Sequence, residues 1–91
     1  MKRIEIMQKI FKRWLKEFKE SHTETQLDFY DSIRKKLINI AENNNYKLIY
    51  ENFALGKENG YLFFRNRETQ KFLAAKTNKE GFFSEEEREL W

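Results

Sequence analysis

Apolar residues recur at three- and four-residue steps through residues 3–20, the spacing that places side chains on one face of an α-helix. The apolar positions of this segment are Ile4, Met7, Phe11, Trp14 and Phe18, with Ile10 and Leu15 beside them. Residues 24–43 repeat the pattern, with Leu27, Tyr30, Ile33, Leu37 and Ile40 on one face. Asn43-Asn44-Asn45 ends this second segment, because asparagine tolerates the left-handed backbone of a helix C-cap. The pattern therefore predicts two amphipathic helices.

From Tyr46 onward the hydrophobic period changes to two, which is typical of a β-strand. Tyr46, Leu48 and Tyr50 are expected on one face, and the strand is expected to reach Leu55 past an irregularity at Asn52. A turn over residues 56–60 ends in Asn-Gly, a pair favoured in hairpins. Residues 61–65 and 70–77 form two further expected strands, joined by a turn at 66–69. Together these segments predict a three-stranded antiparallel meander.

The last residues predict a turn over 78–81 followed by a short helix that ends at Trp91. Ser84 and Glu87 have the spacing of a capping box, and Glu85–Glu87 suit the positive end of a helix dipole. The expected architecture is one α+β domain over residues 1–91. Two N-terminal helices pack on one face of the three-stranded sheet, and a short C-terminal helix completes the order ααβββα.

The composition offers little catalytic chemistry. The chain has no cysteine, one histidine (His22) and three glycines, which excludes thiol chemistry and glycine-rich phosphate loops. We therefore expect a protein that is not an enzyme and that needs no cofactor and no metal. No apolar run approaches the ~20 residues that span a bilayer, so we expect a soluble, cytoplasmic protein that does not bind membranes.

Positive charge is concentrated at the start of the chain. Residues 1–20 carry seven Lys or Arg against three Glu, whereas residues 81–91 carry one Arg against four Glu. The cations that cluster opposite the apolar face of the first helix are Lys2, Lys9, Lys12, Arg13 and Lys16. Such a row can follow a phosphate backbone and release its counterions. An ordinary solvated face is the alternative, because Glu5 and Glu20 fall in the same sector.

A second basic group lies in the predicted hairpin, at Arg65, Arg67 and Lys71. Tyr61, Phe63 and Arg65 share one face of a strand, a grouping suited to base stacking and phosphate contact. Leu62 and Phe64 on the other face are equally apolar. The sequence therefore leaves open which face meets water, and burial is the usual fate of such rings.

These patterns favour a small non-catalytic module that binds nucleic acid, DNA above all, through the basic helix face and the basic hairpin. A composition rich in Lys, Asn, Ile, Phe and Glu matches A/T-rich codons, so we expect a regulator or accessory factor of phage or mobile-element type. The alternative is a protein–protein inhibitor or adaptor, such as a phage protein that blocks a host enzyme or defence complex. Its anchors would be Tyr61, Phe63 and Trp91. The sequence also allows a homodimer, because the two helices carry more apolar positions than a small sheet covers.

Overall fold

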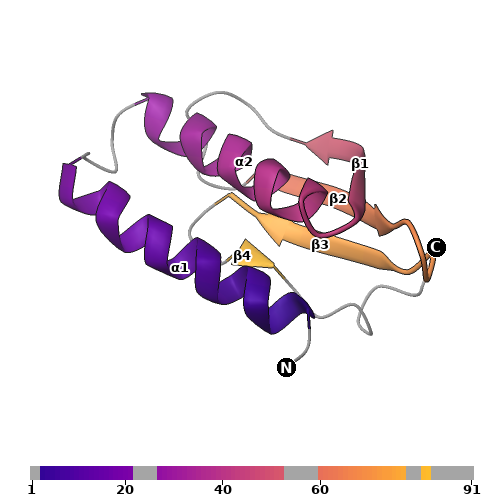
Figure 1. Ribbon diagram of the computed structural model, residues 1–91. Helices are drawn as coiled ribbons and strands as arrows, with labels where there is room; N and C mark the ends of the chain where they lie inside the picture. Colours follow the sequence, from indigo (N-terminus) through magenta and orange to yellow (C-terminus); the bar gives the residue numbers. More distant parts are fainter. Residues whose placement is uncertain (1–2, 22–26, 53–59, 78–80, 83–91) are drawn as a thin grey trace.

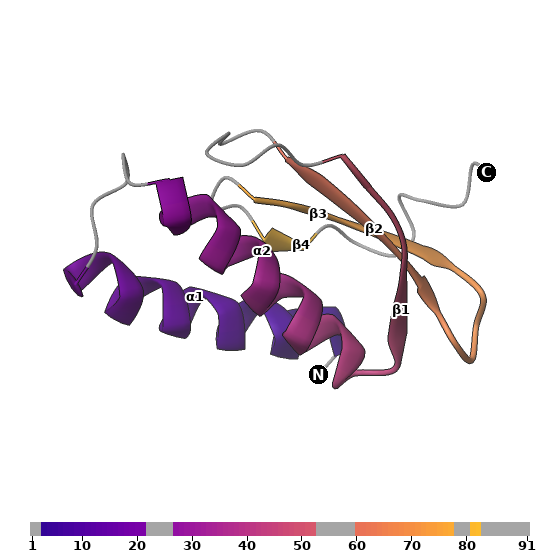
Figure 2. The same cartoon turned by 90° about the horizontal axis from the view of Figure 1, so that it is seen from above.

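A computed structural model of the chain describes residues 3–21, 27–52, 60–77 and 81–82 (Figure 1). Two helices, α1 (Arg3–Ser21) and α2 (Leu27–Glu42), cover one face of an antiparallel sheet. The strands are β1 (Tyr46–Asn52), β2 (Tyr61–Asn66), β3 (Phe72–Lys76) and β4 (Gly81–Phe82), hydrogen-bonded in the order β1-β2-β3-β4. Figure 2 shows the two layers edge-on, with both helices on the same side of the strands. The predicted α+β class and both helices are confirmed.

The sheet differs from the expected one at its end. Gly81 and Phe82, expected at the end of a turn and beyond it, form β4 and pair with Lys76 and Ala75. The predicted three-stranded sheet is therefore not confirmed, because the described sheet has four strands. The predicted C-terminal helix lies outside the described residues, as do residues 53–55 of the first predicted strand.

Aromatic side chains join the two helices. Ring centroids are 5.9 Å apart for Phe11 and Trp14, and 4.8 Å apart for Trp14 and Phe18. The row then crosses to α2, where the ring of Phe29 lies 5.4 Å from that of Phe18 and 5.1 Å from that of Tyr30. Edge-to-face and tilted pairs at these distances stabilise the helix–helix contact beyond the apolar area they bury.

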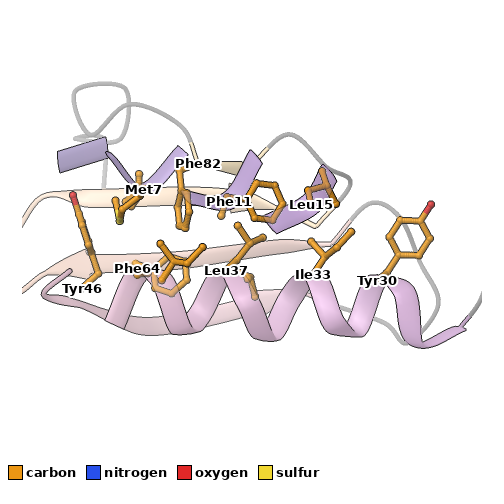
Figure 3. Close-up of a cluster of buried hydrophobic side chains, with 14 of the residues drawn as sticks. Met7, Phe11, Leu15, Tyr30, Ile33, Leu37, Tyr46, Phe64 and Phe82 are labelled. Carbon is orange, nitrogen blue, oxygen red and sulfur yellow. The ribbon is translucent and has the colours of Figure 1, made fainter. Parts of the chain in front are cut away.

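The main core lies between the helix layer and the sheet (Figure 3). Its fully buried side chains include Met7, Phe11, Ile33, Leu37, Leu62, Phe64 and Leu73, from both helices and two strands. Burying each side chain of this size contributes about 1.5–3 kcal/mol. This core fixes which side of each strand faces the helices, and hence which side faces away.

Helix α2 ends as the asparagine triplet predicts. Asn45 adopts a φ of 72°, and the Asn44 side-chain amide donates a hydrogen bond of 2.7 Å to the Ile40 carbonyl oxygen. The left-handed residue reverses the chain direction so that β1 begins at Tyr46.

Strand β1 contains a bulge that the sequence did not reveal. Leu48 pairs with Phe64 and Tyr50 pairs with Phe63, so Ile49 is an extra residue on β1. The strand stays in register up to Asn52, which pairs with Tyr61, and the predicted continuation past Asn52 lies outside the described residues. The expected face is wrong at one position. Tyr50 leaves the side of Tyr46 and Leu48 and joins that of Phe63.

Candidate functional site

The side of the sheet that faces away from the helices carries a mixed aromatic and basic surface. We call it the open sheet face. The strand pairing assigns to it Lys47, Tyr50 and Asn52 of β1, Tyr61, Phe63 and Arg65 of β2, and Phe72, Ala74 and Lys76 of β3. No described helix or strand packs over this face (Figure 2). The choice between the two faces of β2 is thereby resolved: Leu62 and Phe64 are buried, whereas Tyr61 and Arg65 are exposed.

Three rings form a continuous row on the open sheet face. Tyr50 is 57% exposed and Tyr61 is 37% exposed, while Phe63 between them is half-buried. The ring of Phe63 lies 5.8 Å from that of Tyr50 and 6.5 Å from that of Tyr61, and the planes of Phe63 and Tyr61 are inclined by only 19°. Grouped aromatic exposure of this kind marks binding surfaces more often than a scattered apolar residue does.

Two cationic side chains of the open sheet face lie beside aromatic rings of the same face. The Arg65 guanidinium lies 4.8 Å from the centre of the Phe72 ring, and Lys76 Nζ lies 6.0 Å from the centre of the Tyr61 ring. Both distances suit cation–π attraction, which favours positions of the charged groups beside the rings. Positive charge is therefore held at both ends of β2 on this face.

A basic hollow of about 380 Å³ opens where β1, β2 and the turn after β2 meet. Its lining consists of Lys47, Ile49, Arg65, Arg67 and Gln70. Three of these five side chains are cations and none is a carboxylate, so the hollow concentrates positive potential.

The carboxylates in the described parts of the sheet and its turns (46–52, 60–77 and 81–82) are Glu51 and Glu68. Glu51 Oε2 lies 2.6 Å from Arg34 Nη2 of α2, on the helix side of the sheet. Glu68 Oε1 accepts a hydrogen bond of 2.6 Å from Asn45 Nδ2 and lies 3.9 Å from Arg3 Nη2. Both carboxylates are thus engaged by groups outside the open sheet face.

The cations predicted on the first helix lie on a different surface. Lys9, Lys12, Arg13 and Lys16 are all exposed on α1, opposite its buried residues Met7, Phe11 and Leu15. They therefore face away from the core, on the helix side of the molecule, whereas Arg65 belongs to the open sheet face. The structure does not bring the two predicted basic groups together, and Lys2 lies outside the described residues.

The α1 surface also has mixed charge. A hollow of about 320 Å³ beside it is lined by Lys12, Leu15, Lys16, Lys19 and Glu20. Exposed Glu5 and Glu17 lie on the same helix. Interleaved carboxylates weaken the field of such a helix, in contrast to the open sheet face.

The remaining predicted residues are divided between the turn after β2 and the undescribed end. Arg67 is exposed in that turn and lines the basic hollow, while Lys71 is half-buried just before β3. Trp91 lies outside the described residues. Tyr50 could not be found as a member of the surface from the sequence, because the bulge that changes its face has no local sequence signal. Lys47 lies before the bulge and alternates with Tyr46 and Leu48 as predicted, but the sequence did not show which face of β1 is exposed.

Neither a metal-ligand group nor a membrane-spanning helix is found among the described residues. Among them, no group of three or more His, Asp or Glu side chains could hold a metal ion. His22 lies outside them. No described helix is both long enough and apolar enough to cross a lipid bilayer. No family model, no curated protein and no solved structure matches this chain.

Proposed function

We propose that this chain is a small non-catalytic nucleic-acid-binding module whose contact surface is the open sheet face. One observation carries the proposal: exposed Tyr50 and Tyr61 flank Phe63 on a surface with Lys47, Arg65 and Lys76 and with no described carboxylate. Nucleic acids present both complementary features, since every base has a π-face and every nucleotide has a negative phosphate.

The basic side of α1 has a secondary role in this proposal. Lys9, Lys12, Arg13 and Lys16 face the other side of the molecule, so they attract a polyanion over a distance without contacting the same segment. Attraction of this kind raises the association rate and falls off beyond about 10 Å at moderate salt.

A salt titration of binding tests the proposal. Fluorescence anisotropy of labelled oligonucleotides should show that the logarithm of the affinity falls linearly with that of the salt concentration. Each neutralised phosphate of a single strand contributes about −0.7 to this slope, so three contacting cations give a slope of about −2. An affinity that stays constant between about 50 and 200 mM salt would contradict nucleic-acid binding.

The exposed rings also support a second candidate, the protein–protein inhibitor or adaptor. Tyr61 and Tyr50, on either side of Phe63, could anchor in pockets of a protein partner, since tyrosine is enriched at binding hot spots. A pull-down from a bacterial lysate with and without nuclease separates the two candidates. Loss of the captured material after nuclease supports nucleic-acid binding, and a stoichiometric protein that persists supports the inhibitor or adaptor. As a nucleic-acid-binding module, the chain would be a regulator or accessory factor of phage or mobile-element type. As an inhibitor or adaptor, it would be a phage protein that blocks a host enzyme or defence complex.

A further inference from the structure

We infer that the ligand of the open sheet face is a single-stranded nucleic acid, with bases on the tyrosine and phenylalanine rings and a phosphate in the basic hollow. The inference rests on the proposed function and deepens it, because it specifies both the strandedness of the ligand and the surface that binds it.

The aromatic rings of the open sheet face indicate that the ligand is single-stranded. The rings of Tyr50, Phe63 and Tyr61 offer flat apolar surfaces. Such a ring contributes most binding free energy when a base stacks on it. In a duplex the faces of the bases are already stacked on their neighbours, and only their edges are available in the grooves. A single strand exposes those faces, so it can use the rings where a duplex cannot.

The order of groups along β2 gives the path of the strand. Arg65 lines the hollow at one end, Phe63 and Tyr61 follow, and Lys76 lies beside Tyr61 at the other end. The sequence of charge, ring, ring and charge matches a short run of nucleotides whose phosphates reach the cations while its bases lie on the rings. A footprint of about four nucleotides fits, at the lower end of the site sizes of small single-strand-binding domains.

The charge distribution favours this surface over α1. The open sheet face has no described carboxylate, whereas the hollow beside α1 includes Glu20. Duplex DNA would be expected to choose the cations of α1, because a row of lysines needs only phosphates. The two surfaces lie on opposite sides of the molecule, so variants can test them separately.

The experiment compares labelled oligo-dT and oligo-U of about 12 nucleotides with a duplex of the same length. Both single strands should bind more tightly than the duplex, and a difference between them identifies DNA or RNA as the preferred source. Tyr50→Ala and Tyr61→Ala should each weaken single-strand binding roughly 5- to 150-fold, the range expected for loss of one base-stacking contact. Ile6→Ala and Ile10→Ala are the matched controls, because these α1 residues are 41% and 43% exposed and should leave the affinity unchanged.

A second pair of variants tests the charges. Lys47→Gln removes a cation that lines the basic hollow, and Lys16→Gln removes an exposed cation of α1. Lys47→Gln should reduce the single-strand affinity, and its salt slope by about 0.7 for one lost phosphate contact. Lys16→Gln should have the smaller effect on both, because Lys16 attracts the ligand over a distance without contacting it. Circular dichroism and thermal unfolding verify that each variant is folded.

The outcomes separate the inference from the proposed function. Salt-dependent binding that is lost with Lys16→Gln but kept with Tyr50→Ala overturns the single-strand inference and leaves nucleic-acid binding in place. Absence of binding to all three oligonucleotides contradicts both. A dimer in sedimentation that Tyr50→Ala dissociates would assign the open sheet face to a second copy of the chain, and would also overturn the inference.

Discussion

Arg34 of α2 and Glu51 of β1 form an ion pair that links the helix layer to the sheet. Arg34 Nη2 lies 2.6 Å from Glu51 Oε2, and Arg34 Nε donates a hydrogen bond of 2.7 Å to the same oxygen. The bulge in β1 turns Glu51 toward the helices, so the pair also keeps this carboxylate away from the rings of the open sheet face.

A double-mutant cycle should measure this ion pair. Arg34→Ala, Glu51→Ala and the double variant, compared by urea unfolding, should give a coupling free energy of about 0.5–1 kcal/mol, because both side chains are partly in water. The coupling should decrease at high salt, which screens exposed charges. Additive effects of the two substitutions would show that the pair does not contribute to stability.

Asn66 should be a stabilising residue of the turn between β2 and β3. It is only 2% exposed, and its Oδ1 accepts hydrogen bonds from the backbone N–H groups of Glu68 at 2.8 Å and Thr69 at 3.1 Å. Asn66→Ala should lower the free energy of unfolding by about 1–3 kcal/mol, because these donors lose their partner. Arg67→Ala, in the same turn but exposed, serves as the control and should change it by less than about 0.5 kcal/mol. Equal effects of the two substitutions would contradict the role of Asn66.

Gly81 should not tolerate a side chain. Its φ is +80°, and a Cβ there would overlap the Gln8 side-chain oxygen and lie 3.1 Å from Phe11 Cδ2. Gly81→Ala should therefore lower the free energy of unfolding by about 1–3 kcal/mol, through backbone strain and crowding against α1. In a Gln8→Ala background the cost should be smaller but should not vanish, because the backbone strain persists. A wild-type melting temperature for Gly81→Ala would refute this prediction.

The hydroxyl of Tyr46 should be dispensable for stability. Tyr46 is fully buried, and its hydroxyl has no hydrogen-bond partner among the described residues. Tyr46→Phe should leave the free energy of unfolding unchanged or raise it by up to about 1 kcal/mol, since it removes a buried polar group. Tyr46→Ala should lower it by about 3–5 kcal/mol through loss of the ring. A clear loss of stability with Tyr46→Phe would indicate that the hydroxyl is satisfied in solution.

The helices could be predicted closely because their buried faces are periodic. The predicted segment 3–20 corresponds to α1 at Arg3–Ser21, and the predicted segment 24–43 corresponds to α2 at Leu27–Glu42, with residues 24–26 outside the described residues. Strand β4 could not be predicted, because a two-residue strand has no alternating pattern and forms only through its pairing with β3. Judged from the sequence alone, Gly81 of β4 resembles a turn residue.

The candidate surface was predicted in part. Tyr61, Phe63 and Arg65 were placed on one face, but Leu62 and Phe64 were equally apolar, and only packing against the helices decides between the two sets. The exposure of the α1 cations follows from the helical period. Their orientation relative to Arg65 does not, because it depends on how α1 docks on the sheet.

The bulge makes one position of β1 dispensable. A deletion of Ile49 would leave Leu48 opposite Phe64 and Tyr50 opposite Phe63, so the strand could shorten by one residue without displacing the tyrosine. Strand β2 has no extra residue of this kind in its pairing with β3. A deletion between Tyr61 and Arg65 would therefore turn part of its aromatic row toward the helices. Among natural variants of this chain, changes in length should therefore accumulate in β1 and be rare in β2.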